Sequence, residues 1–471
     1  MSPSRLVAAL AVAAGACGVT AGPAMAGGTL TPVSGHLVAY VQHLAGPAFA
    51  GSGLAWATPA PPGQGGYTVT VDSGGQVTKQ HVYAAGGDAD SGDDIVLSAV
   101  AASADMVAFA VSVSRCADES ACKYQQFEPV ESSVFAGPLG GKLELRQCAG
   151  PPETEQSVDL GGTVLAAFNS CAGGATVRDL AAGPDAPWRE YPSTGRVRIA
   201  GHFVAVSLNA GAIAVYDART GEQVYKLEPP SGSLAFDVQD DGTIAFERPI
   251  EVPDRAQTTE LDMASVAQPS PRRVAGIGVA GDVRVASGRV AVRDGDDFRV
   301  FGLDGTELAS TSARDAIGSF DFDGSRLAFG LQPCGLVAIA TWDLEGAAPG
   351  LPAGNCPRAR LTSGVGVADL HRRVLRMKIR CPATPALGCS GDWYARFAGE
   401  SFYSRWVALG PGERTTLRVG LLRHRVCALA RNHGGRAKVS LAPTYTLRPP
   451  AAGRDEPLEV RVEGKPRGCK G

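Results

Sequence analysis

Apolar residues alternate with small or polar residues along most of this chain, and glycine-containing breaks interrupt the alternation. The stretch GHFVAVSLNAGAIAVYDARTGEQV, residues 201–224, is a clear example, with breaks near Asn209 and Gly221. A period of two residues predicts β-strands, whereas an amphipathic helix would repeat its apolar residues every three or four positions. Gly accepts a positive φ and Asn or Asp bonds its own backbone, so the breaks predict turns between antiparallel strands. We therefore expect an all-β protein.

A short motif recurs through this pattern: a polar or turn residue, an apolar residue, alanine and another apolar residue. The copies are HLVAY, DMVAF, HFVAV, GTIAF, GRVAV and SRLAF, with TVLAA as a weaker one; the aligned alanines are Ala39, Ala108, Ala166, Ala205, Ala245, Ala291 and Ala328. Several successive copies lie about 40 residues apart, which is typical of propellers and solenoids, and the alternation favours a propeller. We predict about seven four-stranded blades, within a range of six to eight, over residues 27–354, with the alanines on the close-packed inner strands.

The copies SRLAF and GTIAF and the segment IAVYDARTGE resemble blades of the TolB-type and WD40-like β-propellers of secreted bacterial proteins. The resemblance covers residues 27–354 and implies a fold without indicating a ligand. Quinoprotein propellers, which are related, use the same DxxTGE turn. Only residues 217–222 show it clearly here, without the tryptophan pattern of those blades, so we expect no quinone cofactor.

The pattern changes in residues 355–471. In VLRMKIRC, Leu375, Met377 and Ile379 lie on one face of a strand and basic residues on the other. One buried and one charged face is typical of a sandwich sheet, and some seven strands can be drawn, as in an immunoglobulin-like sandwich. The segment also resembles C-terminal β-sandwich domains of exported actinobacterial proteins, a resemblance that implies no activity. We predict a small, basic, immunoglobulin-like β-sandwich here.

Charge separates the two parts of the chain. Residues 357–471 hold 22 Lys and Arg against 8 Asp and Glu, and the remainder holds 22 against 39. The basic part either rests against the acidic propeller or adheres to an anionic wall polymer or surface. The basic residues occupy alternate strand positions without interleaved aromatic residues, so we expect no nucleic-acid binding.

The N-terminus is typical of a secretory signal: Arg5 is followed by an apolar run over residues 6–16 and by small residues at Ala24 and Ala26. We expect residues 1–26 to be removed and the protein to be secreted or held at the cell envelope. The alternative is a lipoprotein signal that anchors the chain through Cys17.

Ten cysteines remain after Cys17. An even number in an exported chain predicts disulfides, and no CxxC spacing indicates zinc. Pairing neighbours in sequence, with connectivity left open, gives Cys116 with Cys122, Cys148 with Cys171, Cys334 with Cys356, Cys381 with Cys389, and Cys427 with Cys469.

Candidate chemical residues are scattered. The histidines make no metal-binding spacing, and His36 and His202 precede the repeat strand, which favours a role at a blade turn. We interpret the clustered aspartates as residues of DG-type turns: Asp237, Asp240, Asp241, Asp294, Asp296, Asp297, Asp321 and Asp323. One further run has the density of oxygen ligands that calcium prefers but is otherwise an ordinary hydrophilic loop: Asp88, Asp90, Asp93 and Asp94.

With no GxSxG elbow, P-loop or dinucleotide motif present, the sequence favours a non-enzymatic, monomeric binding or scaffold module at the envelope or outside the cell. We expect a protein or envelope glycan as its partner and no cofactor. The alternative is a propeller glycan hydrolase or lyase, because acidic residues from several blades converge only on folding.

Overall fold

The computed structural model describes residues 28–464 with internal gaps. The longer gaps are 33–44, 60–66, 83–92, 117–126, 150–156, 170–173, 229–234, 251–257, 347–354, 384–387, 422–425, 428–434 and 443–455, and the others span three residues or fewer. Almost every described element is a β-strand; two single 3-10 turns, η2 (Leu180–Ala182) and η3 (Asn209–Gly211), interrupt them. The expectation of an all-β protein is confirmed.

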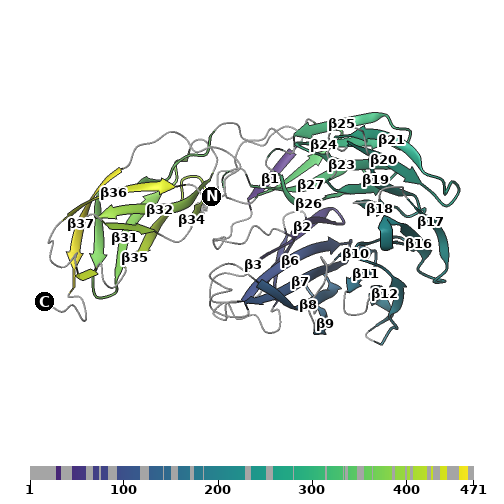
Figure 1. Ribbon diagram of the computed structural model, residues 1–471, viewed down its shortest axis with the longest axis horizontal. Coiled ribbons are helices and arrows are strands. Elements are labelled where there is room, and N and C mark those ends of the chain that lie inside the picture. Colours follow the sequence, from purple (N-terminus) through teal and green to yellow (C-terminus); the bar gives the residue numbers. More distant parts are fainter. Residues whose placement is uncertain are drawn as a thin grey trace, which may run out of the picture.

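The described residues between Gly28 and Asp343 form seven four-stranded antiparallel sheets, which we number as blades in chain order (Figure 1). Blade 1 contains β2 (Ala45–Ala50), β3 (Gly53–Pro59), β4 (Tyr67–Asp72) and β5 (Val77–Val82). Blade 2 contains β6 (Asp93–Ala102), β7 (Met106–Cys116), β8 (Phe127–Pro138) and β9 (Glu144–Ala149). Blade 3 contains β10 (Val158–Gly161), β11 (Val164–Asn169), β12 (Gly174–Asp179) and β13 (Arg189–Pro192).

The next three blades repeat this order. Blade 4 contains β14 (Val197–Ala200), β15 (Phe203–Ser207), β16 (Ile213–Asp217) and β17 (Gln223–Leu227). Blade 5 contains β18 (Phe236–Val238), β19 (Ile244–Ile250), β20 (Thr258–Ala264) and β21 (Arg272–Ile277). Blade 6 contains β22 (Val283–Ala286), β23 (Arg289–Asp294), β24 (Asp297–Gly302) and β25 (Glu307–Ser312).

Blade 7 joins the two ends of the propeller sequence. It contains β26 (Ala316–Phe322), β27 (Arg326–Leu331) and β28 (Ala338–Asp343), and its outer strand is β1 (Gly28–Pro32), which pairs with β28. The inner strands β2, β6, β10, β14, β18, β22 and β26 contact one another in this order, and β26 contacts β2. The sheets therefore form a closed ring around an axis, as the repeat predicts.

The repeat alanines lie on the second strand of each blade, not on the inner strand that we expected. Ala205 of β15, for example, pairs with Arg198 of the inner strand β14. In blade 1 the equivalent residue is Ala55, which pairs with Ala48, whereas Ala39 lies outside the described residues. A directly opposed pair projects from the same face of a sheet, so each alanine leaves space beside the inner-strand residue that it faces.

Apolar side chains fill the space between neighbouring blades. Between blades 4 and 5, for example, Phe203 and Ile213 pack with Phe236 and Phe246. Burying each such side chain contributes roughly 1.5–3 kcal/mol, and the ring shape gives every blade two such neighbours.

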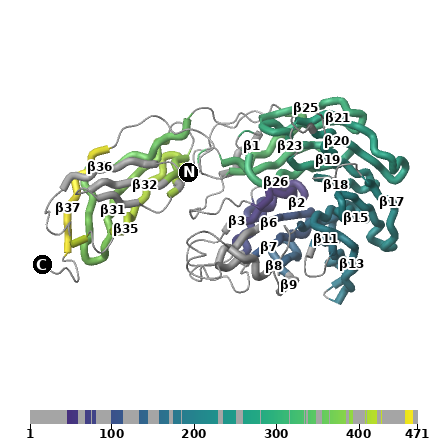
Figure 2. Tube along the Cα trace, in the orientation of Figure 1, coloured from purple at the N-terminus to yellow at the C-terminus, as the bar shows by residue number. Residues whose placement is uncertain are grey.

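The described strands of the C-terminal part form one nine-stranded sheet. They are β29 (Arg360–Leu361), β30 (Val365–Asp369), β31 (Val374–Arg380), β32 (Cys389–Phe397), β33 (Glu400–Tyr403), β34 (Val407–Leu409), β35 (Arg414–Gly420), β36 (Gly435–Ala442) and β37 (Glu456–Glu463). The sheet curls around a single core that includes Leu375, Met377 and Leu458, and its end strands β33 and β34 contact β35. As expected, a small β part follows the propeller (Figure 2), and because its one sheet curls around the core we call it the sandwich.

Two of the expected disulfides are present, Cys334–Cys356 and Cys381–Cys389, with Cα–Cα distances of 5.4 and 5.7 Å. Cys427 is also disulfide-bonded. The other expected pairs involve Cys122, Cys171 and Cys469, which lie outside the described residues, together with Cys116 and Cys148, of which only the backbone is described.

Candidate functional site

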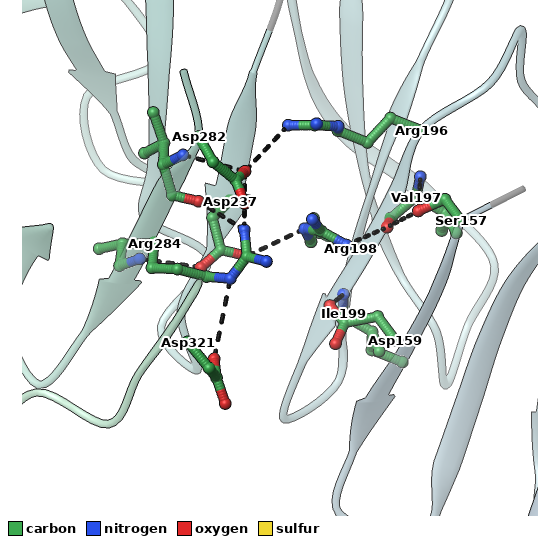
Figure 3. Close-up of polar contacts among 12 residues, drawn as sticks. Ser157, Asp159, Arg196, Val197, Arg198, Ile199, Asp237, Asp282, Arg284 and Asp321 are labelled. Atoms are coloured by element: carbon green, nitrogen blue, oxygen red, sulfur yellow. Dashed lines mark hydrogen bonds and ion pairs between the residues drawn. The ribbon is translucent and has the colours of Figure 1, made fainter. Parts of the chain in front are cut away.

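Charged residues meet at the propeller axis, where five consecutive inner strands place one charged side chain each. Each of these residues pairs with the repeat alanine of its blade. We call them the axial layer: Asp159, Arg198, Asp237, Arg284 and Asp321, from blades 3 to 7 (Figure 3). Acidic and basic residues alternate from one blade to the next. Blades 1 and 2 have Ala48 and Ala101 at the same position.

Each carboxylate of the axial layer accepts a hydrogen bond from the backbone of the following blade. Asp159 Oδ2 accepts from the N–H of Ile199 at 2.9 Å, and Asp237 Oδ2 accepts from that of Val285 at 2.8 Å. Asp321 Oδ2 accepts from the N–H of Phe49 at 2.7 Å, across the junction between blades 7 and 1. In all three cases the donor directly follows the axial-layer position of its own blade, so a single geometry is repeated around the ring.

The arginines of the axial layer complete this chain of contacts. Arg198 Nε lies 3.7 Å from Asp237 Oδ1, and Arg284 Nε lies 3.7 Å from Asp321 Oδ1. Consecutive contacts therefore link every blade from blade 3 to blade 7 and then to blade 1. Burial raises the pKa values of Asp237 and Asp321, while the neighbouring arginines oppose this shift. These charged groups are paired with one another or hydrogen-bonded to backbone groups, and such additional hydrogen bonds stabilise a buried ion pair.

A second polar level lies two residues earlier in the sequence, directly before the inner strands of blades 4 and 6 begin. Arg196 Nη1, next to blade 4, lies 3.4 Å from Asp282 Oδ1, next to blade 6. Arg284 Nη1 lies closer to the same oxygen, at 2.9 Å. Burial alone would raise the pKa of Asp282, but Arg284 and Arg196 outweigh it, so the pKa is lowered and Asp282 stays ionised.

Glu247 is a fully buried carboxyl group beside this level. Its Oε1 accepts a hydrogen bond from the N–H of Gly281 at 3.0 Å, and its Oε2 has no hydrogen-bond partner among the described residues. Gly281 is required here, because a Cβ would lie 2.8 Å from the carbonyl oxygen of Arg293. Burial raises the pKa of Glu247 to about 7.

A cavity of about 450 Å³ opens at the end of the axis where the inner strands begin. Its lining comes from blades 4, 6 and 7: Arg196, Gly281, Asp282, Arg293, Gly295, Gly318 and Ser319. Arg293 stands across the strand ladder from Asp282, whose carbonyl oxygen accepts its N–H. Its guanidinium donates to the carbonyl oxygen of Ala316 at 3.0 Å. This axial cavity thus has two cationic side chains and one hydroxyl group facing one carboxylate that already has two arginine partners.

Two of the expected turn aspartates lie elsewhere. Asp237 and Asp321 belong to the inner strands and to the axial layer, which corrects the turn interpretation. The glycines that follow them in sequence belong to the next turns. Because these glycines are so near, the local sequence is typical of a turn although the aspartates lie on strands. The remaining aspartates of the group lie in turns or at the strand ends beside them: Asp240, Asp241, Asp294, Asp296, Asp297 and Asp323.

Other predicted residues have structural positions. His202 lies in the turn before β15, with its Nε2 3.8 Å from Asp217 Oδ2, and Asp217 also bonds Arg219 within the next turn. His36 lies outside the described residues, as do Asp88 and Asp90; of Asp93 and Asp94 only the strand backbone is described. Within the described ranges, no group of three or more His, Cys, Asp or Glu is placed to hold a metal ion. None of the helices in that part of the chain could cross a membrane.

The sequence interpretation missed most of the axial layer, although the repeat contains a signal for it. The axial-layer residue stands seven positions before the repeat alanine, as Arg198 does before Ala205, in every blade except blade 5, where Asp237 stands eight before Ala245. Aligning the copies upstream of the alanine would have shown Asp and Arg alternating there.

No protein-family model matches this chain, and no curated protein matches it. Among solved structures, it is similar to the WD40 domain of Neurospora crassa Pan2, at 11% identity and a TM-score of 0.42, over 65% of this chain and 89% of that one. It is also similar to the β-propeller domain of Myceliophteria thermophila Cps50 (Swd1), at 12% identity and a TM-score of 0.42, over 67% of this chain and 99% of that one. The WD40 domain of Toxoplasma gondii coronin is similar at 12% identity and a TM-score of 0.41, over 70% of this chain and 88% of that one. The fold assignment rests on the seven sheets themselves.

Proposed function

We propose that this protein is an exported, non-enzymatic binding module whose propeller engages its partner at the axial cavity. The observation that carries the proposal is the contrast between two levels of the axis. In the axial layer the charges are paired with each other or with backbone N–H groups and serve to hold the blades together. At the cavity, Arg196 and Arg293 have cationic groups beside open space.

Export is supported by the N-terminal signal pattern of residues 1–26 and by the two disulfides, since disulfides persist in oxidising compartments. We propose that mature chains begin at Gly27 and are secreted or held at the cell envelope. N-terminal sequencing of the exported protein tests this directly. A chain that keeps residues 1–26, or one that is lipid-modified at Cys17, would contradict the proposed processing.

We also propose that the propeller is related to the TolB-type propellers and that the sandwich is immunoglobulin-like. The sandwich carries exposed basic side chains on β31 and β35, on the faces opposite its core. We propose that these basic side chains bind an anionic polymer of the envelope. The propeller would then be held there with its cavity open to a protein or glycan partner.

The partner is tested with the mature chain, residues 27–471, immobilised and exposed to arrayed glycans and to protein and polymer fractions of the envelope. The proposal expects saturable retention of one component without any chemical change to it. The double variant Arg196→Gln/Arg293→Gln should lose this retention, and Lys79→Gln, which removes one exposed charge from the outer strand of blade 1, should keep it. Failure to retain any component would contradict the proposal.

One observation favours the alternative of a glycan hydrolase or lyase. Glu247 is a buried carboxyl group whose pKa of about 7 suits a general acid, and its neighbour Gly281 lines the cavity. A panel of polysaccharides assayed for new reducing or unsaturated ends decides between the two functions. Turnover that Glu247→Gln abolishes in a folded protein would establish the enzyme, and binding without turnover supports the binding module.

A further inference from the structure

We propose that the axial cavity binds a small polar ligand through an oxyanion group, a carboxylate or a phosphate, held by Arg196 and Arg293. This inference rests on the proposed binding function and names the ligand chemistry of the same site. The cavity volume, about 450 Å³, lies within the range of small-molecule sites in proteins.

The guanidinium of Arg196 has more hydrogen-bond donors than acceptors around it. A guanidinium has five N–H donors, and in the part of the chain that the structure describes Arg196 uses one of them, on Asp282 at 3.4 Å. Its side chain is 31% exposed and lines the cavity. Burial and the neighbouring Arg198 lower the pKa of Arg196, which means that its positive charge is in an unfavourable environment. A bound anion would stabilise that charge.

Arg293 adds a second guanidinium. Within the described ranges its side chain donates one hydrogen bond, to the carbonyl oxygen of Ala316, which carries no net charge. Ser319 supplies a hydroxyl group from the third contributing blade. Two guanidinium groups and a hydroxyl group around one space match the hydrogen-bond pattern of an oxyanion, because guanidinium forms paired, charge-assisted bonds with carboxylate and phosphate.

The carboxylates near the cavity do not cancel this positive charge. Asp282 Oδ1 accepts from the N–H of Val283 and from both Arg196 and Arg284. Arg284, at 2.9 Å, is the closer of its two arginine partners, so the charge of Arg196 is only partly balanced. Glu247 lies behind Gly281, where its raised pKa leaves a large fraction uncharged near neutral pH.

A matched set of three hexose derivatives tests the inference: glucose, glucuronate and glucose 6-phosphate, titrated by calorimetry into the mature chain. They share a sugar ring and differ in the oxyanion, so the two anionic compounds also separate a carboxylate from a phosphate preference. We expect at least one of them to bind saturably and glucose not to bind. Equal binding of glucose, or no saturation by either anion, would overturn the inference.

Variants of the two arginines locate the binding. Arg196→Gln and Arg293→Gln should each weaken binding of the anion by about 10- to 100-fold, the usual effect of losing hydrogen bonds to a charged group. Lys79→Gln on the outer strand of blade 1 makes the same change in net charge and should leave the affinity for the anion unchanged. Arg293→Gln does not disturb the Asp282 ion pairs, so it gives a valid result even if Arg196→Gln folds poorly. Unchanged affinity in Arg293→Gln would contradict the site.

The two proposals fail in different ways. If neither anion binds but the envelope component is still retained, the ligand chemistry is wrong and the binding module stands. If the anion binds but no envelope component is retained, the cavity chemistry stands and the proposed module is wrong.

Discussion

At the scale of a single residue, Asp321 of blade 7 links the two ends of the propeller through its contact with Phe49 of blade 1. One of its oxygens accepts the N–H of Phe49 at 2.7 Å, and the other lies 3.7 Å from Arg284 Nε. A carboxylate in such a position is stable only while both its hydrogen bonds and its charge partner are present. The same reasoning applies to Asp159 and Asp237, so the axial layer acts as a series of links between blades.

Replacement of Asp321 by alanine should lower the free energy of unfolding by about 1–3 kcal/mol, because it leaves the Phe49 N–H without its acceptor. Urea denaturation of the mature chain measures this. Asp321→Asn keeps an acceptor for that N–H and should lose less.

The matched control is Asp296→Ala, which removes an exposed aspartate from a turn of blade 6. A loss in Asp321→Ala no larger than in this control would show that the link between blades 7 and 1 contributes nothing to stability.

Glu247 should make stability depend on pH. Its pKa is about 7 in the folded protein and has an ordinary value of 4.5, so between these values the folded state binds more protons than the unfolded state. The free energy of unfolding therefore falls as the pH rises through this interval, and the full penalty is present above pH 7.

Glu247→Gln removes this penalty and should be more stable than the parent protein at pH 8, by on the order of 2–3 kcal/mol, with a difference that shrinks toward pH 4.5. Denaturation curves at several pH values measure the difference, and the exposed Glu345→Gln serves as the control. A gain that stays constant from pH 5 to pH 8 would contradict the buried position of this carboxyl group.

Residue roles were harder to predict than strands, and Asp237 and Asp321 show why. Asp237 stands three positions before another Asp and Asp321 stands two before one, and a Gly follows each within five positions, so the local sequence is typical of a turn. Their partners Arg198, Arg284, Val285 and Phe49 come from other blades. Only the ring brings them together, and alternation within one blade contains no information about contacts across blades.

At the scale of elements, β1 closes the ring. It pairs in antiparallel register with β28, from Gly28 opposite Trp342 to Pro32 opposite Ala338, and so covers the outer edge of blade 7. A chain that lacks residues 1–32 would expose the backbone groups of β28. We expect a lower Tm and association through this edge, because an unpaired strand edge is a template for pairing with another chain.

A chain that begins at Gly28 is the control for this truncation, since it keeps β1 whole. Thermal denaturation and size-exclusion chromatography compare the two. Equal Tm values and equal elution of both chains would contradict the closing role of β1.

The strands themselves could be predicted because each has a local period of two residues. The motif around Ala205 recurs as a second strand in successive blades, which is enough to indicate the fold. Which strand lies innermost is decided by packing around the axis, and the motif does not contain that information. For this reason the prediction places the alanines on the inner strands, whereas they lie on the second strands.

At the scale of the whole molecule, a buried contact joins propeller and sandwich. The Cys334–Cys356 disulfide connects the loop between β27 and β28 to the segment before β29, and Ser390 Oγ of β32 donates to the carbonyl oxygen of Cys334 at 2.5 Å. Both cysteines are buried. The disulfide thus holds the position to which the sandwich attaches.

The double variant Cys334→Ala/Cys356→Ala should loosen this attachment. We expect limited proteolysis to separate the sandwich from the propeller faster than in the parent protein, because loss of the cross-link releases the chain that leads to β29. Cys381→Ala/Cys389→Ala removes a disulfide inside the sandwich and keeps the Cys334–Cys356 cross-link, so it should speed cleavage between the two parts less than the first variant does. Equal cleavage rates in the parent protein and the first variant would show that the disulfide does not hold the junction.

We propose that the propeller binds its partner at the axial cavity, and hydrogen–deuterium exchange of the mature chain with and without the retained partner locates the bound residues. We expect added protection in residues 281–295 and 316–319, which contribute to the cavity from blades 6 and 7, and unchanged exchange in the outer strands β5 and β17. Protection confined to the outer strands or to the sandwich would contradict it.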